Sequence, residues 1–183
     1  MPLDPKYKDN PNSYGYISVI NHWLIAVLVI VMLFLGLSLE FADLGSQKRN
    51  MLSLHKSLGA IVLILGTWRV LWRVFNGFPA RNFAIKHWQQ NAAKFTHILL
   101  LLSLIIMPLS GYVMTEAAGR PVNVFMLFSL PPIPDSRYLK EVAELIHSIC
   151  AYSICGLLIA HIGGALCHQI VDKKPILKRM LFK

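Results

Sequence analysis

Long apolar runs alternate with short polar stretches along this chain of 183 residues. Four of the runs contain about the twenty residues that a helix needs to cross the hydrocarbon core of a bilayer. Helices are favoured there, because in lipid a helix satisfies its own backbone polar groups. The pattern predicts an all-α integral membrane protein, a four-helix bundle formed by residues 1–183 as one domain. The predicted spans are residues 17–39, 52–72, 95–114 and 142–170.

The segments between these runs differ in length and character. Residues 40–50 form a short polar linker, and residues 76–90 form a basic and aromatic one. The longest linker, residues 115–140, contains an apolar patch at residues 124–130 followed by three prolines. That patch is too short to cross a bilayer. We expect it to lie at the membrane interface or to cover one end of the bundle.

Composition and charge agree with a multi-pass protein surrounded by membrane lipid. Hydrophobic residues make up 55% of the chain and charged residues 15%, whereas roughly a quarter of the residues in soluble domains are charged. The net charge of +9 does not indicate a nucleic-acid partner, because the basic residues cluster at the ends of the apolar runs. Twelve lysines and arginines fall on the side of the N-terminus and six on the other side. Since cytoplasmic loops carry the excess of Lys and Arg, both termini are predicted to be cytoplasmic.

Histidines are the candidate functional residues, because five of the seven lie within or at the edges of the apolar runs. Ionisable side chains are costly in hydrocarbon, so such a set indicates a function. Neutral imidazole is a common ligand of iron, and histidines on facing helices suit a haem between them. The chain lacks the CxxCH motif of covalent haem attachment, so any haem is held without thioether bonds. The histidines of interest are His22, His55, His97, His147 and His161, with His168 following on the last run.

These histidines sort into two levels along the predicted helices. His147 and His161 are 14 residues apart, which is ~21 Å along a helix with both rings on nearly the same face. That distance suits two haems stacked across the membrane, each taking one ligand from this helix. At the outer level His55 can oppose His147. At the inner level either His22 or His97 can oppose His161, and the spacing leaves this choice open.

Several short segments in a fixed order make the chain resemble a known family, the bacterial cytochrome b561 proteins, which are related to the cytochrome b subunits of nickel hydrogenases. The resemblance covers nearly the whole chain. It implies a four-helix bundle in the bacterial inner membrane with two b-type haems, exchanging electrons with quinone. The matching segments are residues 20–23 (INHW), His55 with Gly59, Arg69 with Arg73, His97, residues 108–111 (PLSG), and His147, His161 and His168.

The resemblance also implies the haem ligands and the reaction. By matched position, His22 and His161 would bind the inner haem, and His55 and His147 the outer one. The similarity is particularly close to the superoxide oxidase branch, which implies transfer of electrons from superoxide on the outer side to ubiquinone. An alternative is an anchor subunit that relays electrons from a hydrogenase or dehydrogenase to quinone. A different class is a haem-free metal or proton transporter that uses the same histidines.

Charged and polar residues near the histidines complete the predicted site. Arg69 and Arg73 lie one turn apart and can pair with inner haem propionates or substrate anions, or else extend to the inner surface. Lys56 lies beside the outer ligand and can meet a propionate or an anion such as superoxide. His97 and His168 are the candidates for a quinone pocket, because quinone reduction needs a hydrogen-bond or proton donor near its carbonyls.

Overall fold

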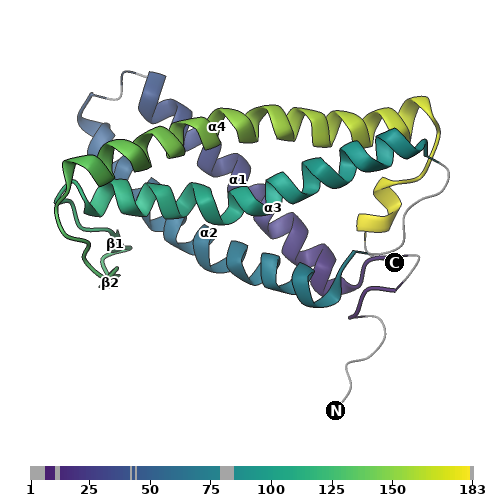
Figure 1. The fold of residues 1–183 in the computed structure, drawn as a ribbon, viewed down its shortest axis with the longest axis horizontal. Coiled ribbons are helices and arrows are strands. Elements are labelled where there is room, and N and C mark those ends of the chain that lie inside the picture. Colours follow the sequence, from purple (N-terminus) through teal and green to yellow (C-terminus); the bar gives the residue numbers. More distant parts are fainter. Residues whose placement is uncertain (1–6, 11–12, 42, 44, 79–84, 182–183) are drawn as a thin grey trace, which may run out of the picture.

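Four antiparallel helices form most of the structure, a computed structural model (Figure 1). Each is long and apolar enough to cross a membrane, which confirms the predicted all-α, four-helix membrane fold. The helices are α1 (Tyr16–Phe41), α2 (Lys48–Asn76), α3 (His87–Glu116) and α4 (Arg137–Leu166). The structure describes residues 7–10, 13–41, 43, 45–78 and 85–181. Part of the second linker, residues 79–84, lies outside the described residues.

The helices extend beyond the apolar runs that predict them. α3 begins at His87 rather than near residue 95, because the polar stretch before the run is rich in helix-favouring residues such as Gln and Ala. α4 begins at Arg137 rather than near residue 142, and the Ser136 side chain caps it by accepting a hydrogen bond from the Leu139 amide at 3.3 Å. An apolar run therefore marks the part of a helix that lies in lipid rather than the whole helix.

The closest backbone contacts between helices follow the order of the chain. α2 packs against α1, α3 against α2 and α4 against α3, whereas few backbone contacts join α1 and α4. Outward-facing side chains such as Phe34 are apolar and exposed, while the fully buried side chains include Ser18, Asn21 and Ser57. Small and polar residues at helix contacts, with apolar residues outside, are the distribution expected of a protein surrounded by lipid.

A proline in α3 shapes the contact between α2 and α3. Pro108 lies inside α3 and has no amide hydrogen, so the carbonyl of Leu104 loses its helical partner. Gly66 of α2 lies against this carbonyl, and a Cβ atom at Gly66 would be 2.9 Å from the Leu104 oxygen. Glycine therefore allows the two backbones to approach closely at this level.

At the outer end of the bundle, the linker between α3 and α4 forms a β-hairpin. Strand β1 (Asn123–Val124) pairs antiparallel with strand β2 (Phe128–Ser129). Val122 and Val124 are buried against the bundle, whereas Phe125–Phe128 are exposed. The predicted apolar patch thus covers part of the bundle end with its first residue and leaves most of the others uncovered.

At the inner end, the chain turns back on itself after α4. A π-helical turn, Cys167–Val171, is followed by a short 3₁₀ helix, Leu177–Met180. The indole nitrogen of Trp23 donates a hydrogen bond to the Met180 carbonyl at 2.8 Å, which ties this segment to α1. The first and last described segments lie at the same end of the bundle (Figure 1), as the prediction of two cytoplasmic termini requires.

Candidate functional site

A cavity of 1210 Å³ extends between the helices and is bordered by all four of them. Pockets for single small ligands measure about 300–1,000 Å³, so the cavity has room for more than one ordinary ligand. Its lining is mostly apolar, and it reaches from the outer hairpin to the returning C-terminal segment. Every residue of the predicted site lines it. These residues are His22, His55, Lys56, Arg69, Arg73, His97, His147, His161 and His168.

At the outer level, α2 and α4 bring one pair of histidines together. The ring centres of His55 and His147 are 6.4 Å apart. A metal lies about 2 Å from an imidazole nitrogen, which places the centres of two opposed axial rings roughly 6 Å apart. The distance between the two rings therefore fits an iron ion with two axial imidazoles.

The surroundings of His147 favour its role as a ligand. Its Nδ1 atom donates to the Met107 carbonyl at 2.9 Å and lies 3.2 Å from the Ser110 hydroxyl. A proton on Nδ1 leaves the lone pair on Nε2, which is the arrangement of most metal-binding histidines. Gly111 makes room for the ring, because a Cβ atom there would lie 2.9 Å from His147 Cε1. α3 thus provides both the space for this ring and the hydrogen-bonding groups that orient it.

The opposing histidine, His55, differs from His147 in the hydrogen bonding of its ring. Its Nδ1 atom is buried and has no hydrogen-bond partner among the described residues. A buried polar atom without a partner costs free energy, and a bound group that supplied a partner would remove this cost. Gly36 of α1 lies beside the ring, where a Cβ atom would be 3.4 Å from His55 Cε1. The outer pair therefore fits a metal-bearing cofactor in the spacing of its two rings.

At the inner level, His161 of α4 faces two histidines. Its ring centre is 6.1 Å from that of His22 on α1 and 5.1 Å from that of His97 on α3. The His22 distance is close to that of the outer pair. The His97 ring also stacks on Phe78, with centres 6.3 Å apart and planes 12° apart. The structure thus brings all three inner histidines together.

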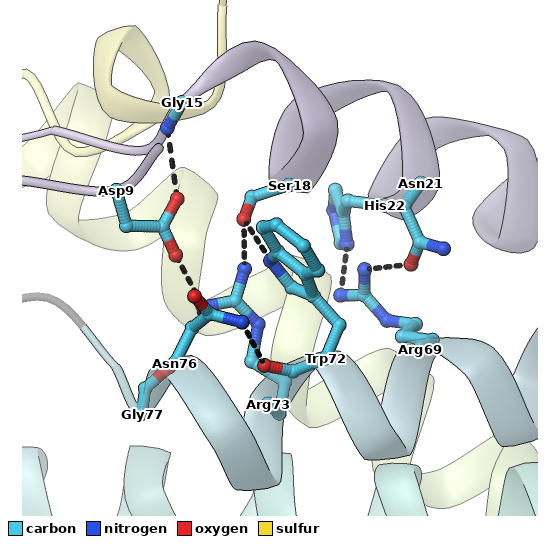
Figure 2. A network of polar contacts seen from close by, with 10 residues as sticks. All are labelled: Asp9, Gly15, Ser18, Asn21, His22, Arg69, Trp72, Arg73, Asn76 and Gly77. Atoms are coloured by element: carbon cyan, nitrogen blue, oxygen red, sulfur yellow. Dashed lines mark hydrogen bonds and ion pairs between the residues drawn. The ribbon is translucent and has the colours of Figure 1, made fainter. Parts of the chain in front are cut away.

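Arg69 contacts His22 directly (Figure 2). Its guanidinium donates to the Asn21 side-chain oxygen at 2.9 Å and to His22 Nδ1 at 3.0 Å. Because a guanidinium has only donors, His22 Nδ1 accepts this bond, and the ring proton of a neutral His22 then lies on Nε2. If His22 held iron through Nε2, the neutral ring would carry its proton on Nδ1 instead, and Arg69 would then be free to donate to an anionic group in the cavity.

Arg73 forms a buried ion pair rather than extending to the surface (Figure 2). It lies 2.7 Å from Asp9, and the two side chains are 5% and 8% exposed. The Arg73 guanidinium also donates to the Gly77 carbonyl at 2.9 Å and to the Ser18 hydroxyl. The Trp72 indole donates to the same hydroxyl at 2.9 Å. Asp9 neutralises Arg73, whereas the hydrogen bonds of Arg69 go to neutral groups, Asn21 and His22.

The segment before α1 adds an aromatic ring to this network. Tyr14 lies under two guanidinium groups, those of Arg73 at 5.2 Å and Arg179 at 5.8 Å from its ring centre. Burial raises the pKa of the Tyr14 phenol, because the charged form is less well solvated there. The ring therefore stays neutral and stacks with the two cations.

Sequence reasoning missed the polar partners of the two arginines, Asp9, Ser18 and Asn21. Ser18 and Asn21 lie at the start of α1, and Asp9 lies ahead of it. A signal was present, because an arginine within an apolar span needs a buried partner. The inner side offers three acidic residues against twelve basic ones, so Asp9 was one of few possible partners.

The remaining predicted residues lie at the two ends of the cavity. Lys56 is half-buried, and its ammonium group donates to the Pro121 carbonyl at 3.0 Å. His168 lies in the π-helical turn at the inner end, with its Nδ1 atom 2.6 Å from the Asp172 carboxylate. Both residues remain in contact with the cavity.

The histidines are arranged in a way that suits haem. In the part of the chain that the structure describes, no group of three or more His, Cys, Asp or Glu side chains is placed to hold a metal ion. Opposed pairs supply two axial ligands, which is the number that a haem iron takes from the protein when histidines occupy both faces.

Comparison with known proteins gives the same indication. A family model described as prokaryotic cytochrome b561 matches residues 13–183. Cytochrome b561 homolog 2 of Escherichia coli (strain K12) is 35% identical over 181 residues, which cover 97% of this chain and 95% of that protein. Cytochrome b561 homolog 1 of the same organism is 26% identical over 174 residues, covering 93% of this chain and 97% of that protein.

Proposed function

Because the chain belongs to the prokaryotic cytochrome b561 family, we propose that it transfers electrons from a donor at its outer end to membrane quinone at its inner end. The family and the four spans make it a multi-pass b-type cytochrome of the bacterial inner membrane that takes part in electron transfer. The number of haems, their ligands and both substrates belong to the proposal.

We propose two haems, each held by a pair of histidines, because the histidines lie at two levels of one cavity. This arrangement is the main support for the proposal. His55 and His147 would hold the outer haem, with ring centres 6.4 Å apart. His22 and His161 would hold the inner haem, with ring centres 6.1 Å apart. When bound, haem supplies reversible one-electron chemistry at iron. Histidines on both faces would leave no coordination position open, so substrates would bind beside the haems rather than at the metal.

Ubiquinone is proposed as the acceptor, with His97 and His168 at its site. Reduction of a quinone to a quinol takes two electrons and two protons, so a donor must stand near its carbonyl oxygens. His168 lines the cavity and lies 2.6 Å from Asp172, whose side chain is 35% exposed. That pair would connect the water at the inner end with the cavity. Arg69 would meet a propionate or another anion at the same level.

Superoxide is proposed as the donor, with Lys56 beside its site. Lys56 is half-buried and borders the cavity next to His55, and a cation at that position attracts a small anion. Two superoxide ions, one quinone and two protons give two molecules of dioxygen and one quinol, so electrons and atoms balance. Electrons would enter at the outer end and leave at the inner end.

Haem content and superoxide oxidation of the purified chain test this function. We expect a pyridine haemochrome assay to give two b-type haems per chain. A superoxide pulse in the presence of ubiquinone should yield dioxygen and quinol. A chain with two haems and no such activity, which gains activity with a hydrogenase or dehydrogenase, would support the anchor subunit instead. Absence of a b-type absorption band would reject the haem proposal.

A further inference from the structure

The tip of the β-hairpin exposes an unusually apolar surface. It consists of residues 125–128 (FMLF), which connect and enter the two strands. Met126 is 94% exposed and Leu127 is 81% exposed. A large apolar side chain that stays in water lacks roughly 1.5–3 kcal/mol of the stabilisation that full burial would give it. Four of them in a row at a turn therefore indicate an apolar neighbour outside the bundle.

Two hydrogen bonds fix the first strand of the hairpin to helix α2. The Ser57 hydroxyl donates to the Asn123 carbonyl at 3.1 Å and accepts from the Phe125 amide at 3.0 Å. The hairpin is thus pinned on both sides of Val124, which is itself buried. The direction in which the tip points is consequently set by the bundle and not by the loop alone.

The residues of the tip are poor choices for the turn itself. The turn closes through a hydrogen bond from the Leu127 amide to the Val124 carbonyl at 2.9 Å. Its two central residues, Phe125 and Met126, have φ angles of 48° and 60°. Turns of this kind favour Asn and Gly, because other residues are strained at positive φ. Neither turn geometry nor water accounts for phenylalanine and methionine at these positions, but an apolar environment does.

The position of the hairpin identifies that environment as lipid. Ser57 directly follows Lys56 and begins a stretch of α2, residues 57–68, that contains no charged residue. The hairpin therefore docks where α2 passes from the headgroup region into the apolar layer. It extends sideways from the bundle rather than onward along the helix axes (Figure 1). A protein in the outer aqueous space would meet a surface along the axes instead.

We propose that the hairpin tip, Phe125–Phe128, inserts into the outer leaflet of the membrane that the four helices span. Apolar side chains at the boundary of headgroups and acyl chains anchor a segment in this way. The base of the same hairpin borders the outer end of the cavity, where Val122 and Leu130 are part of its lining. The anchor would thus hold this part of the lining at a fixed depth.

Spin labelling of the haem-loaded protein tests this placement without depending on electron transfer. A nitroxide is attached at Leu127→Cys, and separately at Met126→Cys, in vesicles of phosphatidylcholine and phosphatidylglycerol. Collision with oxygen, which concentrates in lipid, is compared with collision with a water-soluble nickel complex. We expect oxygen to exceed the nickel complex several-fold at both positions. The background has alanine at the three native cysteines, Cys150, Cys155 and Cys167.

Arg137→Cys is the matched control at the same end of the bundle. Arg137 begins α4, and its side chain is 91% exposed, so its label should collide mainly with the nickel complex. The reduced-minus-oxidised spectrum of each variant shows that haem is retained. A tip label that prefers the nickel complex would overturn the proposal and leave the tip for a donor protein. Spin–spin broadening that disappears on dilution with unlabelled protein would overturn it in favour of a second copy of the chain.

Discussion

The outer and inner histidine groups offer the same ring chemistry in different surroundings. At the outer level His55 and His147 face each other, and neutral groups, the Met107 carbonyl and the Ser110 hydroxyl, orient the second ring. At the inner level three rings share the space, and a cation, Arg69, contacts one of them. The outer group therefore allows one pairing, whereas the inner group allows two.

The cations near the histidines bear on the proposed electron transfer. Arg73 is neutralised by Asp9, but Arg69 has no acidic partner among the described residues. A positive charge close to a redox centre favours the reduced form, because added electron density is attracted to it. Arg69 should therefore raise the reduction potential of the proposed inner haem, as Lys56, which borders the cavity next to His55, should raise that of the outer one.

Removal of His147 tests the outer histidine pair and should have the largest effect of these substitutions on haem binding. His147→Ala leaves His55 without an opposing ring, so we expect the haem content to fall from two per chain to one. A pyridine haemochrome assay on the purified variant measures this. His87→Ala is the control, because His87 lies at the start of α3 and is absent from the cavity lining. An unchanged haem content in His147→Ala would contradict the assignment.

Separate replacement of the two inner candidates decides between the two inner pairings. We expect His22→Ala to lose the inner haem, because its ring lies at the same distance from His161 as the outer rings lie from each other, to within 0.3 Å (6.1 against 6.4 Å). His97→Ala should keep both haems and lose quinone reduction. Absorption spectra and haem content distinguish the two. If His97→Ala loses haem and His22→Ala keeps it, the inner ligand is His97.

Removal of the carboxylate of Asp9 should destabilise the inner end. Asp9→Asn leaves the buried Arg73 charge without its counter-ion, which typically costs about 3–5 kcal/mol of unfolding free energy. Thermal unfolding in detergent, followed by loss of the haem absorption, measures the change. Glu141→Gln removes an exposed pair with Arg137 and should change stability by less than about 1 kcal/mol. Equal effects of the two substitutions would show that the Asp9 pair has no special role.

A single methyl group should disturb the outer pair. Gly111→Ala places a Cβ atom 2.9 Å from His147 Cε1, and overpacking of this kind costs about 1–3 kcal/mol. We expect weaker binding of the outer haem with an intact inner haem. Gly156→Ala on α4 is the matched control, because a Cβ atom there meets nothing within 4 Å. Normal outer haem binding in Gly111→Ala would show that the ring can shift at little cost.

Loss of the Arg69 charge tests its electrostatic effect on the inner haem and should cause the smallest change of these substitutions. Arg69→Gln is expected to lower the reduction potential of the inner haem by an amount on the order of tens of millivolts. A spectroscopic redox titration measures both haems at once, so the outer haem serves as the internal control. An equal shift of both potentials would contradict a local effect of Arg69.

Much of the fold followed from the apolar runs and the charge distribution. Runs of about twenty residues identify spans because the thickness of the bilayer sets their length. Helix ends were predicted less well, since α3 begins in a polar stretch at His87 that no hydropathy pattern separates from a loop. The outer pairing could be predicted because only His55 stands opposite His147 at that depth.

The inner site was harder to predict because depth alone does not fix the direction in which a ring points. His22 and His97 lie at similar depths, and the structure places both beside His161. The contacts of Arg69 and Arg73 depend on how α1 lies against α2, which is a property of the packed bundle. Their cavity positions were expected, whereas their polar partners required the structure.

The small number of backbone contacts between α1 and α4 bears on how the protein matures in the cell. Helices α2, α3 and α4 pack in sequence, so they can associate as each leaves the insertion machinery. On this view haem would enter between α1 and α4, where the backbones are least closely packed. Biogenesis would need no opening of an already assembled core. Binding of haem would instead be the step that joins α1 to α4.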